Sequence, residues 1–229
     1  MPLTLVIGNK NYSSWSLRAW IAMTAAGIPF EEISIPLDRP DTQEQIRRHS
    51  PAGKVPVLID GEATVWESIA IMEHLAERFP QAGLWPADPA ARAHARSIAA
   101  EMHASFAALR SHCPMNLWRP VARRDLSLQV ERDVERITRI WREARGKYGQ
   151  GGRYLFGPFT AADAMFAPVA TRLRTYGIAC DAASRAYVEA IHDHPAFKAW
   201  RAAALEESQV IAADEVDWPR VKKVGEGGA

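Results

Sequence analysis

Residues 51–61 read Pro51-Ala52-Gly53-Lys54-Val55-Pro56-Val57-Leu58-Ile59-Asp60-Gly61, which joins a proline, an apolar run and an Asp-Gly pair. The Asp-Gly pair separates this run from Ala63-Thr64-Val65 and is the strongest signal of a short hairpin in the chain. Pro56 stands directly before the first strand, although proline cannot donate to a strand ladder. Either it simply initiates the strand, or a cis Val55-Pro56 bond turns the backbone of Val55 outward to meet an extended peptide.

Around this hairpin, the first 80 residues alternate short apolar runs with helical patterns. Leu3, Leu5 and Ile7 lie on one side of a first strand, with Val6 between them. The pattern further predicts a helix from Leu17 to Thr24 that stops at Gly27, a strand over 32–35, and helices over 42–48 and 67–78. The order strand, helix, strand, helix, hairpin, helix indicates an α/β unit.

The chain changes character at residues 80–89, which contain three prolines and one glycine and are typical of a linker. Beyond this point we find no strand pattern. Two apolar stripes with helical spacing follow, made of Ala95, Ile98, Met102, Phe106 and Leu109, and of Leu126, Val130, Val134, Ile137, Trp141 and Ala144. We therefore predict an α/β domain over residues 1–80, a linker over 81–89 and an all-helical domain over 90–229.

Composition excludes several classes of function. With 28 basic and 27 acidic residues among 229, the net charge is +1, so there is no electrostatic reason to expect nucleic-acid binding. Apolar runs end well before the roughly 18 residues that a membrane span needs, and no signal peptide is recognisable. Cys113 and Cys180 have no metal or dithiol spacing, which favours a cytoplasmic protein. Pairs such as His103 and His112 are read as ordinary histidines, and no metal site is expected.

The turn after the first strand reads Asn11-Tyr12-Ser13-Ser14-Trp15-Ser16-Leu17-Arg18. Ser13 or Ser14 can cap the following helix, because a serine oxygen accepts a hydrogen bond from a free backbone N–H. The same free N–H groups and the helix dipole can instead hold an anion. The turn alone is compatible with either interpretation.

Glu67-Ser68 opens the helix predicted over 67–78. An acidic residue at this place suits the helix dipole without any ligand. Alternatively, Glu67 faces a ligand ammonium, while the hydroxyl and N–H of Ser68 hold the ligand's carboxylate. Only the combination with the serine turn and Val55-Pro56 makes the second interpretation specific.

Together, the three motifs resemble the glutathione-binding half of a glutathione S-transferase, in its serine-type classes such as zeta. The resemblance extends over nearly the whole chain, through Trp85-Pro86 and through Leu155-Phe156-Gly157-Pro158-Phe159-Thr160-Ala161-Ala162-Asp163. It implies a thioredoxin-like domain followed by an all-helical domain, usually in a homodimer, and a structural capping box formed by Thr160 and Asp163. Trp15 stands where the zeta class commonly has cysteine, which argues against an isomerase of the zeta kind.

The resemblance also assigns roles in binding glutathione and activating its thiol. Ser13 is implied to donate a hydrogen bond to the sulfur, with Ser14 as the near competitor and Tyr12 as a weaker one. The remaining glutathione contacts that it implies are Val55 and Pro56 at the cysteinyl part, Lys54 at the glycine carboxylate, and Glu67 and Ser68 at the γ-glutamyl end. The alternative for Lys54 is a solvated loop lysine, and Arg18 is expected to be a structural ion-pair partner.

The second substrate is less well specified. Met102, Phe106, Met115 and Trp118 are candidates for an electrophile pocket in the helical domain, or they are simply core residues. The resulting expectation is an enzyme that activates glutathione for attack on a small hydrophobic electrophile. The alternatives are a glutathione-dependent isomerase and a non-catalytic binding protein of the kind that attaches to RNA polymerase under stress.

Overall fold

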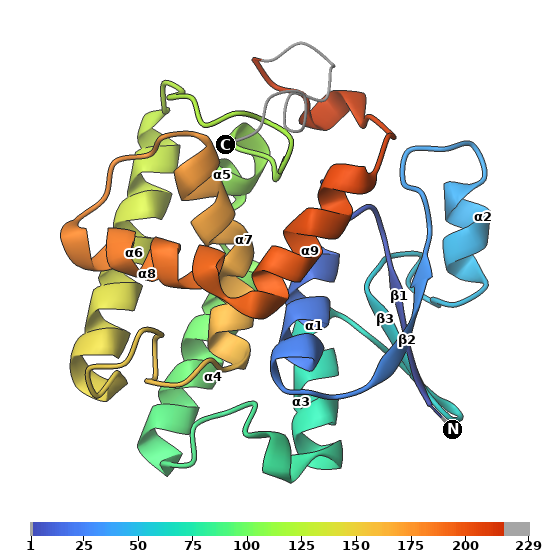
Figure 1. Ribbon diagram of the computed structural model, residues 1–229, viewed down its shortest axis with the longest axis horizontal. Helices are drawn as coiled ribbons and strands as arrows, with labels where there is room; N and C mark the ends of the chain where they lie inside the picture. The colour runs from blue at the N-terminus through green and yellow to red at the C-terminus, as the bar shows by residue number, and fades with distance from the viewer. Residues whose placement is uncertain (1, 218–229) are drawn as a thin grey trace.

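The computed structural model describes residues 2–217 and begins with a four-stranded sheet (Figure 1). β1 (Leu3–Ile7) pairs in parallel with β2 (Phe30–Ser34) and antiparallel with β3 (Val57–Asp60), and β3 pairs antiparallel with β4 (Ala63–Trp66). The strand order is therefore β2-β1-β3-β4. The predicted hairpin is confirmed, with Asp60 opposite Ala63 at its turn.

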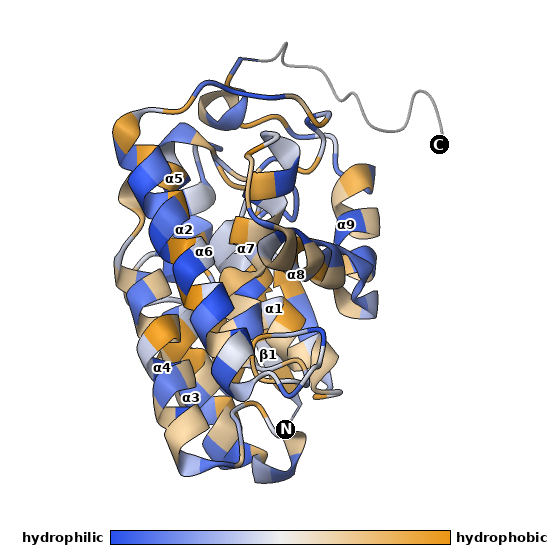
Figure 2. Cartoon of the chain, turned by 90° about the vertical axis from the view of Figure 1, so that its left-hand side faces the viewer, coloured by the Kyte–Doolittle hydropathy of each residue, from blue (hydrophilic) through white to orange (hydrophobic). Residues whose placement is uncertain are grey.

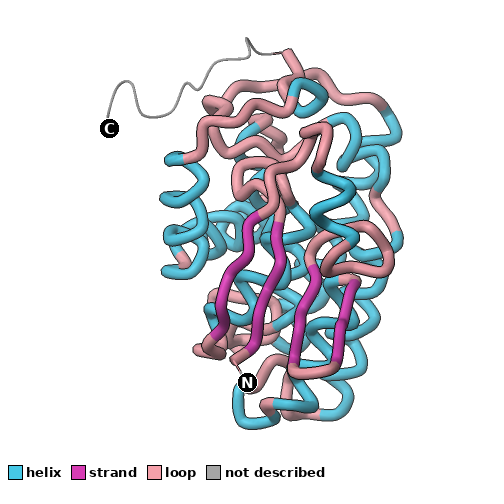
Figure 3. Tube along the Cα trace, turned by 90° about the vertical axis from the view of Figure 1, so that its right-hand side faces the viewer, coloured by secondary structure: helices cyan, strands magenta, loops and turns pink. Residues whose placement is uncertain are grey.

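Helices cover both faces of this sheet, as Figures 1 and 3 show. Leu5 and Leu58 belong to the main core on the side of α1 (Ser14–Ala25) and α3 (Ser68–Arg78). Val6 and Val57 point the other way and pack with Ile46 of α2 (Thr42–Arg47). This is the alternation of strand side chains that the sequence pattern predicts.

The second half of the described chain is helical. Its elements are the short helix η1 (Pro80–Ala82), α4 (Pro89–Ala104), α5 (Ala107–His112), α6 (Leu128–Tyr148), α7 (Ala161–Thr175), α8 (Ala182–Asp193), α9 (Pro195–Glu206) and η2 (Ala212–Asp214). Hydrophilic and hydrophobic residues alternate along α4 and α6 (Figure 2), as expected of helices that bury one face. α6 begins two residues after Leu126, because the Ser127 oxygen accepts from the N–H of Val130 and caps the helix.

α7 is the central helix of this domain, and nearly all of its residues are buried. Its first turn has the expected capping box, in which the Asp163 carboxylate accepts from both the backbone N–H and the hydroxyl of Thr160. α7 also packs against α1 and so joins the two halves of the molecule. The fold is a thioredoxin-like domain followed by a helical domain.

No helix within residues 2–217 is long and apolar enough to cross a membrane. Residues 218–229 of the predicted C-terminal domain lie outside the described part of the chain.

Candidate active site

Two of the three sequence motifs, and Trp15 from the third, line one hollow of about 410 Å³. It is lined by Lys54, Val55 and Pro56 from the loop before β3 and by Glu67 and Ser68 at the start of α3. The Val55-Pro56 bond is cis, which is the second of the two alternatives that the sequence left open, and pairing of β3 with β4 starts only at Val57. Val55 therefore lies outside the ladder and beside the hollow, where its backbone can meet an extended ligand.

Glu67 is held in an unusual backbone conformation at the mouth of this hollow. Its φ is +67° although it is not glycine, a conformation that costs about 1–3 kcal/mol and persists only where the surroundings enforce it. Its Oε2 lies 3.3 Å from Nε2 of His103, at the end of α4. Burial lowers the pKa of His103, and the charges of Arg18 and Arg110 add to this, whereas Glu67 opposes it. His103 is therefore mostly neutral at pH 7.

Trp15, in the first turn of α1, lines the same hollow. Ser13 caps α1 and lines neither this hollow nor a smaller one beside Ser14. The Ser13 oxygen accepts from the backbone N–H of Ser16, and the two serine hydroxyls lie 2.8 Å apart. Ser16 in turn accepts from the N–H of Gly8, which ties the helix start to the end of β1. The structural interpretation of this turn as an N-cap therefore applies to Ser13, and the helix dipole is available beside it.

The two other donor candidates point elsewhere. Ser14 accepts a hydrogen bond from Arg172 of α7 at 3.3 Å and lines a second, smaller hollow. The Tyr12 hydroxyl donates to Glu215 at 2.5 Å, and burial and this carboxylate raise the pKa of Tyr12. Tyr12 is thus already engaged by the C-terminal segment, which makes it the weakest of the three candidates.

Two guanidinium groups and one imidazole surround the ring of Trp15. Its ring centroid lies 4.0 Å from the guanidinium carbon of Arg18, 5.3 Å from that of Arg110 and 5.1 Å from the ring centroid of His103. The expectation that Arg18 forms a structural ion pair is wrong. Arg18 is fully buried, its Nε donates to the carbonyl of Met165, and no acidic group of residues 2–217 forms an ion pair with it. Stacking on Trp15, three residues earlier on α1, takes the place of that partner.

The residues proposed for an electrophile pocket lie mostly in the core. Met102 and Phe106 are buried in the main hydrophobic cluster and line neither of the two hollows described above. Trp118 packs against Tyr12 and donates its indole N–H to the carbonyl of Ala204. Met115 is buried too, but it lines the smaller hollow beside Ser14. This placement favours a packing role for Met102, Phe106 and Trp118.

The sequence patterns did not indicate that four further charged or titratable residues line these two hollows, namely His103, Arg110, Arg172 and Asp214. His103 and Arg110 reach the site because Phe106, with φ of +63°, turns the chain between α4 and α5. Both side chains then line the same hollow as the motifs. A single positive-φ phenylalanine has no sequence signal, so this turn was not predictable.

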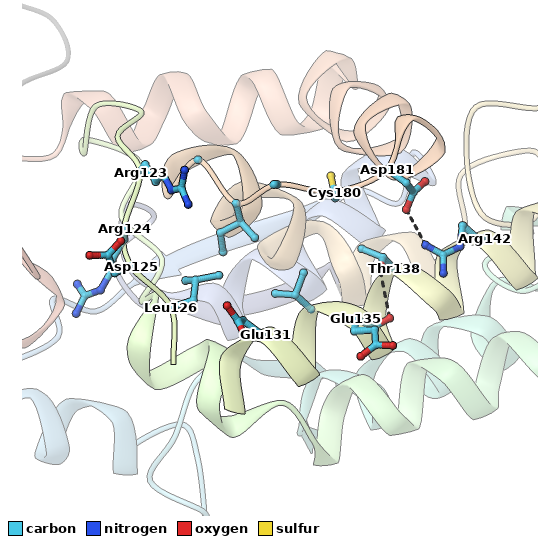
Figure 4. A pocket seen from close by; sticks show the side chains of 14 residues that line it. Arg123, Arg124, Asp125, Leu126, Glu131, Glu135, Thr138, Arg142, Cys180 and Asp181 are labelled. Atoms are coloured by element: carbon cyan, nitrogen blue, oxygen red, sulfur yellow. Dashed lines mark hydrogen bonds and ion pairs between the residues drawn. The ribbon is translucent and has the colours of Figure 1, made fainter. Parts of the chain in front are cut away.

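A larger hollow of about 530 Å³ lies on the helical domain, between α6 and the loops that precede α6 and α8 (Figure 4). Charged side chains surround it, and Arg142 closes one end through an ion pair of 2.8 Å with Asp181. It shares no residue with the hollow formed by the motifs and contains none of the predicted site residues. Volume alone therefore does not identify the active site.

Two models of known protein families match this chain. The model of the glutathione S-transferase N-terminal domain matches residues 12–78, and that of the C-terminal domain matches residues 89–203. The chain belongs to the glutathione S-transferase family. The resemblance read from the three sequence motifs is thereby confirmed.

Individual relatives share parts of this transferase-family chain. A dichloromethane dehalogenase from Methylorubrum extorquens is 47% identical over 60 residues, which cover 25% of this chain and 21% of the dehalogenase. A stringent starvation protein A homolog from Coxiella burnetii is 26% identical over 176 residues, which cover 77% of this chain and 78% of the length of the homolog. The chain spans 21% of the length of the dehalogenase and 40% of the length of a probable maleylacetoacetate isomerase from Caenorhabditis elegans.

Solved structures support the fold. A glutathione transferase homolog from Burkholderia, crystallised with bound glutathione, superposes with a TM-score of 0.68. The match covers 91% of this chain and 100% of the other, at 24% identity. At this level of identity the likeness establishes the fold alone.

Proposed function

We propose that the protein is a glutathione transferase, which activates the thiol of glutathione for attack on a small electrophile. Residues 1–80 bind glutathione, and residues 90–229 bind the electrophile and form a homodimer, with 81–89 as the linker. The described cysteines are unpaired, which fits a cytoplasmic site of action, and removal of toxic electrophiles is the role that such chemistry serves.

One observation carries this proposal: the cis Val55-Pro56 loop, the Glu67-Ser68 corner and Trp15 near the start of α1 line a single hollow. Each motif alone has a structural explanation. Their convergence supplies the Val55 backbone for a peptide, the Glu67 carboxylate for an ammonium, and the Ser68 N–H for a carboxylate. The buried Ser68 hydroxyl lies 3.7 Å from the sulfur of Met165. Glutathione is a tripeptide with an extended backbone, an ammonium and carboxylates, which are the complements of these protein groups.

The electrostatics of the turn suit a thiolate. A free thiol has a pKa of about 8.5, and positive charge near the sulfur lowers it. Here the N-terminus of α1 and the guanidinium groups around Trp15 supply that charge. A serine hydroxyl that donates to the sulfur stabilises the same ionised form.

Replacing Glu67 with glutamine should weaken glutathione binding about tenfold to a hundredfold, measured by isothermal titration at pH 7. The carboxylate is the partner proposed for the ligand ammonium, and such charged hydrogen bonds contribute about 1.5–3 kcal/mol. Glu62→Gln is the matched control, since Glu62 is exposed at the tip of the hairpin. An unchanged dissociation constant for Glu67→Gln, or no binding by the natural chain, would contradict the proposal.

Glutathione affinity should also fall as the pH is lowered from 7 to 5.5. His103 is mostly neutral at pH 7 because burial lowers its pKa, and it gains protons as the pH falls. The imidazolium then competes with the ligand ammonium for Glu67. Titrations at pH 7.0, 6.2 and 5.5 measure the effect. His103→Gln removes the titrating group and should flatten the profile; an equally steep profile in this variant would show that another group is responsible.

A second candidate is a binding protein without turnover. It is favoured by the match to the stringent starvation protein A homolog, which covers 77% of this chain. Affinity capture from lysate with and without glutathione separates the two candidates. Recovery of one stoichiometric protein partner, together with no glutathione binding in the titration, would favour this second function.

A further inference from the structure

A second hollow of about 260 Å³ opens beside the N-terminus of α1 and shares Trp15 and Arg110 with the proposed glutathione hollow. Ser14, Arg172 and Asp214 also line it. Because the two hollows adjoin at Trp15 and Arg110, a group bound in the second hollow lies next to glutathione in the first. The second hollow is therefore placed to receive the electrophile.

Positive charge dominates the lining of the second hollow. Arg172 is only 3% exposed and is held by the carbonyls of Cys113 and Pro168 and by the Ser14 oxygen. Arg110 is anchored by the carbonyl of His103 and by stacking on Trp15. Within residues 2–217, neither guanidinium forms an ion pair with a carboxylate at 4 Å or less. Both are thus fixed in place with charge left over for a ligand.

The guanidinium of Arg18, which stacks on the Trp15 ring at 4.0 Å, adds a third positive charge near this hollow. Arg18 is fully buried, and its two terminal nitrogens have no hydrogen-bond partner within the described chain. Burial lowers the pKa of Arg18, and the charges of Arg172 and Arg110 lower it further, which means that the three cations repel one another. Uncompensated buried charge is strongly unfavourable, and a bound anion would relieve it.

We propose that the second hollow binds a carboxylate carried by the electrophile, with Arg110 and Arg172 as its partners. The inference rests on the proposed glutathione chemistry and names its substrate class: small electrophiles with a carboxylate a few bonds from the reactive carbon. The thiolate sulfur forms a bond to that carbon, and the leaving group departs with the electron pair of the bond that breaks. The carboxylate itself is unchanged and serves to orient the substrate.

Asp214 limits the charge that the hollow accepts. Of the residues that line the second hollow, it is the acidic one, and it contributes electrostatically to Arg172. Burial raises the pKa of Asp214 to about 6, so it is mostly ionised at pH 7.5 and repels an incoming anion. Removing its charge should therefore strengthen anion binding, which is the opposite of removing an arginine.

Two glutathione conjugates test the proposal, because they occupy both hollows without any need for turnover. S-carboxymethylglutathione carries a carboxylate next to the sulfur, and S-carbamoylmethylglutathione is its neutral isostere. Isothermal titration at pH 7.5 should give about tenfold tighter binding of the carboxylate conjugate by the natural chain. Arg110→Gln should bring the two affinities to within about threefold, and Asp214→Asn should widen the difference. Arg139→Gln, an exposed charge on α6, is the control and should keep the natural ratio.

The outcomes separate this inference from the proposed function. Equal affinities for the two conjugates, with glutathione bound normally, would overturn the carboxylate site and leave the transferase proposal standing. Failure of glutathione and both conjugates to bind would overturn both. Should Arg110→Gln not fold, the Asp214→Asn arm decides, since a narrowed or unchanged ratio there contradicts the proposal.

Discussion

Replacing Ser13 with alanine should lower the rate of glutathione conjugation about a hundredfold and leave the glutathione dissociation constant within about threefold. Removal of one positioned donor to a developing or stabilised anion typically costs this much in turnover. The thiol is a small part of the ligand, whereas Lys54, Val55, Glu67 and Ser68 are proposed to bind the rest. Binding and turnover should therefore separate.

The hydrogen bonds around Ser13 explain how a capping residue can also donate to sulfur. Its hydroxyl lies 2.8 Å from that of Ser16, and Ser16 accepts from the N–H of Gly8. When a thiolate is present, Ser13 can rotate its proton to the sulfur while the Ser16 hydroxyl donates to the Ser13 oxygen. Loss of the cap in Ser13→Ala should cost only about 1 kcal/mol of stability.

Ser14→Ala is the matched comparison, and both variants are measured with one and the same electrophile under saturating glutathione. The Ser14 oxygen accepts from Arg172, so this hydroxyl also has a proton to donate. A hundredfold loss in Ser14→Ala with little change in Ser13→Ala would reverse the assignment. Small and equal losses in both would assign thiolate stabilisation to the helix N-terminus and its N–H groups instead. Urea unfolding of both variants checks that they are folded.

The parts of the molecule that the sequence predicts well are those set by local signals. The Asp60-Gly61 hairpin, the proline after Val55 and the capping box of Thr160 and Asp163 each depend on residues close together in the chain. Local geometry follows from such short patterns, because turns and caps have specific residue requirements. The Val55-Pro56 loop and the Glu67-Ser68 corner are local patterns of this kind, whereas their joint placement around one hollow was implied only by the family resemblance.

The cationic surroundings of Trp15 were not predictable in this way. Arg110, Arg172 and Asp214 come from α5, α7 and η2, and tertiary packing alone brings them together. Each arginine taken singly is indistinguishable from a surface residue in the sequence. Arg18 is the exception, because its spacing of three from Trp15 on a helix already places the two side chains on one face.

Replacing Asp163 with alanine should have the largest effect on stability, a loss of about 3–5 kcal/mol in urea unfolding at pH 7.5. The carboxylate is fully buried and accepts four hydrogen bonds. Oδ1 accepts from the N–H of Leu155 and the hydroxyl of Tyr187, and Oδ2 from the N–H and hydroxyl of Thr160. Burial raises the pKa of Asp163 to about 6, so at pH 7.5 the group is mostly ionised.

Asparagine should not rescue this position, and that outcome distinguishes the network from a simple cap. Each carboxylate oxygen of Asp163 accepts from one backbone N–H, so the amide nitrogen of asparagine would face such a donor in either orientation. Asp181, the N-cap of α8, is the comparison: it accepts from the N–H and hydroxyl of Ser184 and from Arg142 near the surface. Asp181→Ala should cost about 1 kcal/mol. Equal losses of unfolding free energy in Asp163→Ala and Asp181→Ala would mean that the buried donors around Asp163 find other partners. Apolar packing, and not this carboxylate, would then hold α7 in position.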